Sequence, residues 1–99
     1  MKFSYKISTL AKDDLENIWI YTYENWSLEQ ADKYYESIIN EFESICQHTK
    51  IGKSIEEIKS QHRIHPFQSH LIIYKIKHDK IWIDRILHKQ MDIETRLEE

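Results

Sequence analysis

Histidine and arginine side chains in the second half of the chain are the groups best suited to chemistry. They are His62, Arg63, His65, His70, Arg85 and His88. General acid–base chemistry needs a base, an acid and cations that stabilise developing negative charge, so these groups would have to converge on one concave face. The structural alternative is that a strand arginine is commonly solvated or salt-bridged and that a strand-end histidine commonly packs or hydrogen-bonds.

The spacing of the histidines argues against a metal centre. His62 and His65 fall in one predicted strand, where alternation sends them to opposite faces, and no cysteine or acidic ligand stands at a suitable spacing. The single cysteine, Cys46, lies on an apolar helical stripe and is expected to be a core residue. We therefore expect neither a metal nor a cofactor.

Length and charge limit the number of domains and the classes of function that the chain can have. The 99 residues are predicted to form one domain, 1–99, and 14 Lys and Arg against 17 Asp and Glu give a net charge of −3, which disfavours a general nucleic-acid binder. Cations gather in the second half and leave a local basic surface open, although no dense lysine cluster surrounds the final strands. Neither a signal peptide nor a membrane-spanning run is visible, so a cytoplasmic protein that does not enter the membrane is expected.

Two amphipathic helices are predicted over residues 10–46. Ser8 or Thr9 can cap the first helix, and Ser27 with Gln30 has the capping-box spacing at the start of the second. The apolar stripe of the first helix is predicted to contain Ala11, Leu15, Ile18, Trp19 and Tyr23. The short connection predicts an antiparallel hairpin, and the Asp13-Asp14 pair is interpreted as solvated charge.

Strands flank this hairpin. Residues 3–8 alternate as a half-buried strand, and residues 61–67, 69–77 and 80–88 follow the helices. The His78-Asp79 connection lacks the glycine of the tightest turns and predicts a slightly wider one. Asp92 can cap a short C-terminal helix. The order is that of an α+β domain with an N-terminal strand, an antiparallel αα-hairpin, a three-stranded antiparallel sheet and a short C-terminal helix.

Both faces of the final strands are apolar. Strict alternation groups Ile81, Ile83, Arg85 and Leu87 on one face of the last strand, with Trp82, Asp84, Ile86 and His88 on the other. A helical hairpin covers only one face of a sheet, so we expect another protein to cover the second, with Trp82 as an anchor.

Short motifs along almost the whole chain resemble the ParE branch of the RelE/ParE toxin superfamily. The closing run Arg85-Ile86-Leu87-His88, followed by Met91-Asp92, carries the resemblance most strongly. Supporting positions are Ala11, Asp14, Leu15, Ile18, Tyr21, Trp26, Gln30, Ala31, Tyr34, Phe42, Gly52, Arg63 and the strand from His70 to Tyr74. Ser27 departs from the glycine that the family often has after its tryptophan.

The resemblance implies the toxin of a bacterial type II toxin–antitoxin system. It implies a cognate antitoxin, ParD-like or related, whose C-terminal segment wraps the toxin, with oligomerisation through that complex. It further implies inhibition of DNA gyrase by protein binding, without a known catalytic residue set. The expected partner-binding residues are Trp82, Arg85, Ile86, His88 and Met91.

Two alternatives remain open from the sequence. RelE-like relatives cut messenger RNA in the ribosome, and in that case Arg63, Arg85 and His88 are the candidate catalytic residues. The ParE branch carries the same Arg-Ile-Leu-His run, so the run does not prove catalysis, and the acidic total charge favours gyrase over the ribosome. The second alternative is an inactive relative that retains antitoxin binding.

Overall fold

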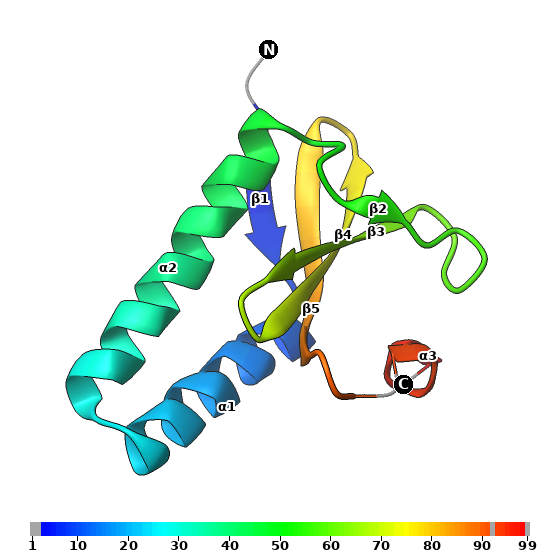
Figure 1. Ribbon diagram of the computed structural model, residues 1–99. Coiled ribbons are helices and arrows are strands. Elements are labelled where there is room, and N and C mark those ends of the chain that lie inside the picture. Colours follow the sequence, from blue (N-terminus) through cyan, green and yellow to red (C-terminus); the bar gives the residue numbers. More distant parts are fainter. Residues whose placement is uncertain (1–2, 92, 99) are drawn as a thin grey trace.

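A helical hairpin packs across one face of a five-stranded sheet in the computed structural model, which describes residues 3–91 and 93–98 (Figure 1). The strands are β1 (Ser4–Ile7), β2 (Lys53–Ser54), β3 (His62–Phe67), β4 (His70–Lys77) and β5 (Lys80–His88). The helices are α1 (Thr9–Asn25), α2 (Leu28–Gln47) and α3 (Ile93–Glu98). The α+β prediction is confirmed, and none of the described helices is long and apolar enough to cross a bilayer.

Serine caps begin both long helices. The Ser8 Oγ accepts a hydrogen bond from the amide of Ala11 at 3.0 Å, and the Ser27 Oγ accepts one from the amide of Gln30 at 3.0 Å, as the capping patterns predicted. The buried helical residues facing the sheet are Ala11, Leu15, Ile38, Phe42, Ile45 and Cys46. Tyr23 was wrongly assigned to this stripe, since its side chain is 51% exposed. The predicted cap Asp92 lies outside the described residues.

The strands run in the order β1-β5-β4-β3-β2. The antiparallel β3-β4-β5 unit was predicted, whereas the short β2 and the parallel pairing of β1 with β5 were not. Pro66 lies inside β3, beyond the stretch that β2 pairs with, so its missing N–H leaves no strand partner unbonded. The last strand in the sequence therefore lies between the first strand and β4.

The β4–β5 turn is tighter than the sequence suggested. Lys77 pairs directly with Lys80, and His78 and Asp79 have φ angles of 52° and 59°. Positive φ at both central residues is the geometry that lets a two-residue loop match the twist of its strands. The expectation of a wider turn was wrong because histidine and aspartate both adopt the left-handed conformation here.

A β-bulge at Asp84 changes which side chains face the helices. Tyr74 pairs with Ile83 and Ile73 pairs with Arg85, which leaves Asp84 as the extra residue. Ile86 consequently joins Ile81 and Ile83 in the core beneath the helices, while Leu87 joins a second cluster on the opposite face. The strict alternation predicted along β5 fails at this point.

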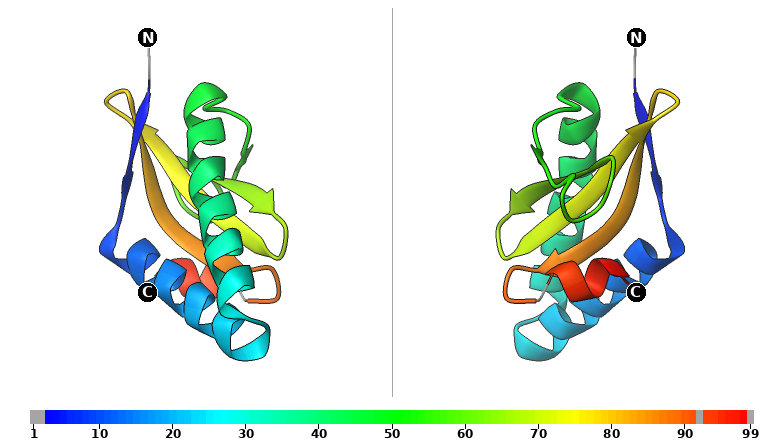
Figure 2. Two further views of the ribbon diagram at one scale, coloured as in Figure 1. Left: turned by 90° about the vertical axis from the view of Figure 1, so that its left-hand side faces the viewer. Right: turned by 90° about the vertical axis from the view of Figure 1, so that its right-hand side faces the viewer.

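The second face of the sheet is covered by the chain itself. Leu71, Ile73 and Leu87 are 8%, 0% and 1% exposed, and they pack with Ile55 from the loop after β2 and with Leu97 from α3. Figure 2 shows α3 on the side of the sheet opposite α2. The expectation that another protein covers this apolar face is therefore corrected.

Gly52 occupies a close approach between the loop after α2 and β4. A Cβ at this position would lie 2.8 Å from the ring atom Cε1 of Tyr74, 2.8 Å from the Tyr74 hydroxyl oxygen and 3.0 Å from the carbonyl oxygen of Ile64. The Tyr74 hydroxyl also accepts the Gly52 amide at 2.9 Å and donates to the Thr49 carbonyl at 2.8 Å. The contact fixes the position of the loop over the end of the core.

We expect Gly52→Ala to lower the free energy of unfolding by about 2 kcal/mol, because overpacking against the fixed Tyr74 ring outweighs the reduced entropy of the unfolded chain. Urea denaturation measures the change. Lys53→Ala, at an exposed neighbour, is the control and should shift stability by less than about 0.5 kcal/mol. Equal stability of the two variants would contradict the close approach.

Candidate functional site

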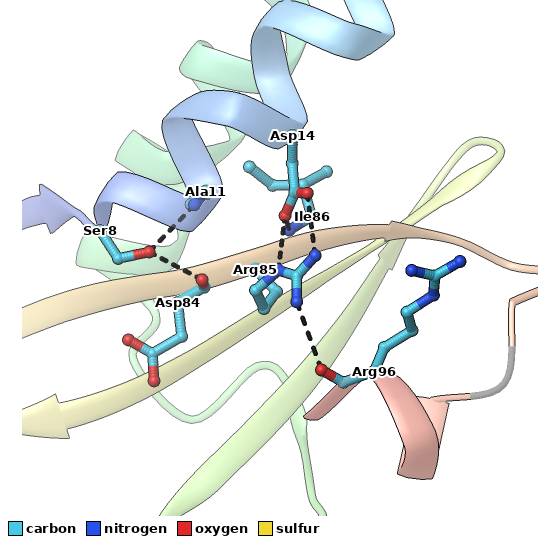
Figure 3. A network of polar contacts seen from close by, with 7 residues as sticks. All are labelled: Ser8, Ala11, Asp14, Asp84, Arg85, Ile86 and Arg96. Carbon is cyan, nitrogen blue, oxygen red and sulfur yellow. Dashed lines mark hydrogen bonds and ion pairs between the residues drawn. The ribbon is translucent and has the colours of Figure 1, made fainter. Parts of the chain in front are cut away.

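A carboxylate on α1 is bonded to the bulged strand β5 (Figure 3). Asp14 accepts hydrogen bonds from Arg85 Nε at 2.9 Å and from Arg85 Nη2 at 3.1 Å, which is a bidentate ion pair. Its Oδ2 also accepts the amide of Ile86 at 2.9 Å, and Arg85 Nη1 donates to the carbonyl of Arg96 at 3.3 Å. Asp14 is therefore not the solvated charge that was predicted.

The bulge itself is held by a second polar cluster. The Ser8 hydroxyl donates to the Asp84 carbonyl at 2.8 Å, and His62 bonds the Asp84 carboxylate through Nε2 and the Ser60 carbonyl through Nδ1. Burial raises the pKa of Asp84, but the hydrogen bond and charge of His62, together with the charges of Lys75 and Lys59, outweigh it and hold that pKa below its usual value. Both nitrogens of His62 face acceptor oxygens, so neither is available for acid–base catalysis.

A groove of about 690 Å³ opens between the helical hairpin and the ends of β4 and β5. Its lining residues are Asp14, Asn17, Ile18, Tyr21, Thr22, Trp26, Gln30, Tyr34, Gln68, Ser69, His70, Ile86, His88 and Met91. Among the described residues that line it, Asp14 is the single carboxylate and there is no lysine or arginine. Aromatic, apolar and neutral polar groups thus make up most of its surface.

Tyrosine and histidine rings contact one another along one wall of the groove. The Tyr34 hydroxyl and His70 Nδ1 are 2.7 Å apart, and the His70 and His88 rings meet edge to face with centroids 5.3 Å apart. Tyr34 also stacks on Phe67, with ring centroids 6.5 Å apart. Burial raises the pKa of Tyr34, so its hydroxyl remains a hydrogen-bond donor at neutral pH.

Burial also lowers the pKa of His70, to about 4, with His88 acting in the same direction and Asp14 in the opposite one. The unfolded ring takes up a proton below about pH 6.5, whereas the folded ring stays neutral until about pH 4. The stability associated with the neutral buried ring is therefore fully present above pH 6.5 and is lost as the pH falls towards 4.

We expect the free energy of unfolding of the unmodified chain to fall by about 2 kcal/mol more than that of His70→Gln between pH 6.5 and 4, after allowance for the partial exposure of the ring. Urea denaturation across this range measures the difference. Taking the difference removes the acid loss contributed by Asp84, which both chains share. Parallel pH profiles would contradict the assignment to His70.

The fold separates the three residues predicted for RNA cleavage. Arg63 Nη1 donates to the Gly52 carbonyl at 2.5 Å, Arg85 is bonded to Asp14, and His88 meets His70 edge to face in the groove. The remaining histidine candidate, His65, contacts Glu41 of α2 at 2.6 Å. The convergence that the sequence left open is thus not found among these residues.

The predicted partner-binding residues divide between the two faces of the sheet. Ile86, His88 and Met91 line the groove. Arg85 does not line it, but its guanidinium is bonded to Asp14, which does. Trp82 lies on the opposite face, where its Nε1 donates to the Lys77 carbonyl at 3.3 Å. It is only partly exposed and is not part of the groove.

Sequence reasoning did not identify Tyr21, Trp26 and Tyr34 as groove residues. Tyr34 packs against the core and also lines the groove, whereas Tyr21 and Trp26 are 62% and 68% exposed. One signal was available: Trp26 stands in the helix connection, where no core position demands an aromatic ring. Asp14 also carried a signal, because it falls on the α1 face that bears Ala11 and Leu15.

Comparisons with known proteins give a consistent assignment. Residues 5–93 match the model of a family described as the ParE toxin of the type II toxin-antitoxin system parDE. The chain is 30% identical over 98 residues to Toxin ParE1 of Mycobacterium tuberculosis, covering 98% of this chain and 100% of that protein. It is 31% identical over 93 residues to Toxin ParE1 of Caulobacter vibrioides, covering 94% and 96%.

Two solved structures share the fold. One is from the chromosomal ParDE TA system from P. aeruginosa, with a TM-score of 0.77 and 20% identity over 88% of this chain and 96% of that one. The other is from the toxin-antitoxin complex RelBE2 from Mycobacterium tuberculosis, with a TM-score of 0.70 and 14% identity over 90% and 100%. These likenesses confirm the predicted RelE/ParE fold.

Proposed function

We propose that this chain, which belongs to the ParE toxin family of type II toxin–antitoxin systems, inhibits DNA gyrase by binding it through the groove between the helical hairpin and the sheet. The observation that carries the proposal is the composition of the groove. Its described lining has exposed aromatic side chains, a single carboxylate and no lysine or arginine.

Such a surface suits a protein partner better than RNA. Exposed tryptophan and tyrosine side chains supply large contact area and often dominate the binding energy of protein interfaces. A groove that holds an RNA phosphate during cleavage instead needs cations to stabilise the developing charge. Trp26, Tyr21 and Met91 at the mouth of the groove therefore support docking of a protein segment.

The positions of the RNase candidates support the same choice. Arg63 and Arg85 are engaged in bonds to Gly52 and Asp14, and neither lines the groove that contains His88. Stabilising a phosphorane beside His88 would require at least one arginine to leave its present partner and cross to the groove. We therefore favour inhibition of gyrase over ribosome-dependent cleavage of RNA as the function of this chain.

A cognate antitoxin is the second partner in this proposal. The two structural neighbours come from a ParDE system and from a RelBE2 toxin–antitoxin complex. An antitoxin segment that fills the groove would neutralise the toxin by excluding gyrase, and oligomers would then form through the antitoxin complex. Because gyrase acts in the bacterial cytoplasm, the proposed site of action is cytoplasmic.

Two parallel assays on toxin freed from its antitoxin test the proposal. One measures gyrase supercoiling and the accumulation of cleaved DNA complexes, and the other measures cleavage of ribosome-bound message. We expect loss of supercoiling with trapped cleaved DNA, restored by stoichiometric antitoxin, and intact message. Cut message with unaffected gyrase would overturn the proposal and make Arg63, Arg85 and His88 the first residues to mutate.

Growth on induction separates an active toxin from an inactive relative. Induced chain should arrest growth, and co-expression of the antitoxin should relieve the arrest. Normal growth, together with inert behaviour in both biochemical assays, would assign the chain to antitoxin binding alone.

A further inference from the structure

The β4–β5 turn end of the sheet carries a lysine-rich surface on the face opposite the groove. Tyr5, Ile7, Ile76, Ile81 and Ile83 all point towards the helices, so the alternate residues of β1, β4 and β5 point to the other face. Those residues include Lys6, Lys75, Lys77, Lys80 and Trp82, which we call the lysine face.

Strand pairing brings these side chains together from distant parts of the chain. Trp82 lies between Lys6 of β1 and Lys75 of β4, because it is the register partner of both. Lys77 is directly opposite Lys80 in the next row. Side chains directly opposite in neighbouring strands are about 5 Å apart at Cβ. The sequence expectation that no dense lysine cluster surrounds the final strands is thus corrected by the pairing, which places Lys6 beside them.

These lysines are not neutralised by their surroundings. Among the described residues, no hydrogen bond or ion pair is made by the side chains of Lys6, Lys77 or Lys80. Lys75 lies close enough to Asp84 to lower its pKa, but that carboxylate is already bonded to His62. Asp79 falls in the turn between the strands. The lysine face is therefore a local positive surface on a chain whose net charge is −3.

We propose that the lysine face binds single-stranded nucleic acid, with the lysines on successive phosphates and Trp82 stacked on a base. Lysines spaced along strands replace the counterions of a phosphate backbone, and an aromatic ring among them stacks on an unpaired base of any sequence. Trp82 favours a single strand over a duplex, whose bases are already stacked, and over an acidic protein segment, which offers no base. The inference goes beyond the proposed function and does not depend on which protein the groove binds.

The placement of the two surfaces allows both to be used at once. The groove opens on the helical side of the sheet. The lysine face lies on the other side, beside the β4–β5 turn, and Figure 2 shows this turn at the end of the sheet away from α3. A protein in the groove would leave the lysine face open. The chain would then contact a nucleic acid while it holds a protein partner.

Salt dependence of binding to oligo-dT tests the proposal on the full chain. With four lysines on phosphates, the logarithm of the association constant should fall with the logarithm of the salt concentration with a slope of about −3. Lys77→Gln combined with Lys80→Gln should reduce that slope to about −1.5. Lys12→Gln combined with Lys33→Gln removes the same charge from exposed helical positions and should leave the slope unchanged.

Emission of Trp82 reports stacking independently of charge. In a chain carrying Trp19→Phe and Trp26→Phe, oligo-dT should quench the remaining tryptophan, and a duplex of the same length should not. A polyglutamate peptide should bind more weakly than oligo-dT. Equal effects of the two lysine pairs, absence of quenching, or preference for the duplex or for polyglutamate would each overturn the proposal.

Discussion

Replacing Asp14 by asparagine should lower the free energy of unfolding by about 3 kcal/mol, because the substitution removes the carboxylate charge that the partly buried Arg85 guanidinium contacts through two hydrogen bonds. The change also replaces a carboxylate oxygen that accepts both Arg85 and the amide of Ile86. Urea denaturation at neutral pH measures the loss. Asp13→Asn removes the same charge from the exposed neighbour and should cost less than about 0.5 kcal/mol.

A double-mutant cycle separates the ion pair from general damage to the helix. Asp14→Leu and Arg85→Met each break the ion pair and keep one of its two charges, whereas the double variant removes both charges. The double variant should therefore be more stable than the sum of the two single changes predicts, by at least about 1 kcal/mol. Simple additivity, or similar losses in Asp14→Asn and Asp13→Asn, would mean that the contact does not stabilise the fold.

Trp26→Ala should weaken binding of the protein partner about 100-fold while the free energy of unfolding changes by less than about 1 kcal/mol. The ring is 68% exposed and lines the groove beside Tyr21, with ring centroids 6.2 Å apart. Its loss removes contact area from a partner but little from the core. The affinity for gyrase is measured by the concentration of chain that half-inhibits supercoiling. The affinity for the antitoxin is measured by titration.

Tyr23→Ala is the matched control for Trp26→Ala. Tyr23 is an exposed aromatic residue of α1 that stacks on Trp19 and lies outside the groove. We expect its removal to leave both affinities within about threefold of the unmodified chain. Equal losses from the two substitutions would show that exposed aromatic surface in general, rather than the groove, determines binding.

Local chemistry accounts for the parts of the fold that the sequence predicted well. Helix starts at Ser8 and Ser27 depend on a hydroxyl and on the residues that follow it, and both serines cap as expected. The tight turn at His78 and Asp79 and the bulge at Asp84 were not predicted, because each depends on strand pairing rather than on local preference. The cover over Leu71, Ile73 and Leu87 likewise depends on where a six-residue helix docks.

The site residues divide in the same way into those that the sequence predicted and those that depend on strand pairing. Ile86, His88 and Met91 were selected through the family resemblance, and they line one groove. The partner of Arg85 required knowing that Asp14, 71 residues earlier, lies across from it. Trp82 was placed on the right strand, but the face that it shares is built by Lys6 from the other end of the chain. The sequence shows that these side chains are present, but the order and pairing of the strands determine which of them are neighbours.

The central position of β5 also determines when the sheet and the groove can form during synthesis of the chain. A growing chain emerges from the ribosome N-terminus first, at about 5–20 residues per second. Yet β1 has no strand to pair with until β5 appears, and the contact of Ser8 with Asp84 closes a span of 76 residues. Ile86 and His88, which line the groove, also belong to β5. A chain cut short during synthesis before β5 therefore contains both long helices but lacks the β5 side of the groove, so the proposed binding to a protein partner requires synthesis through β5.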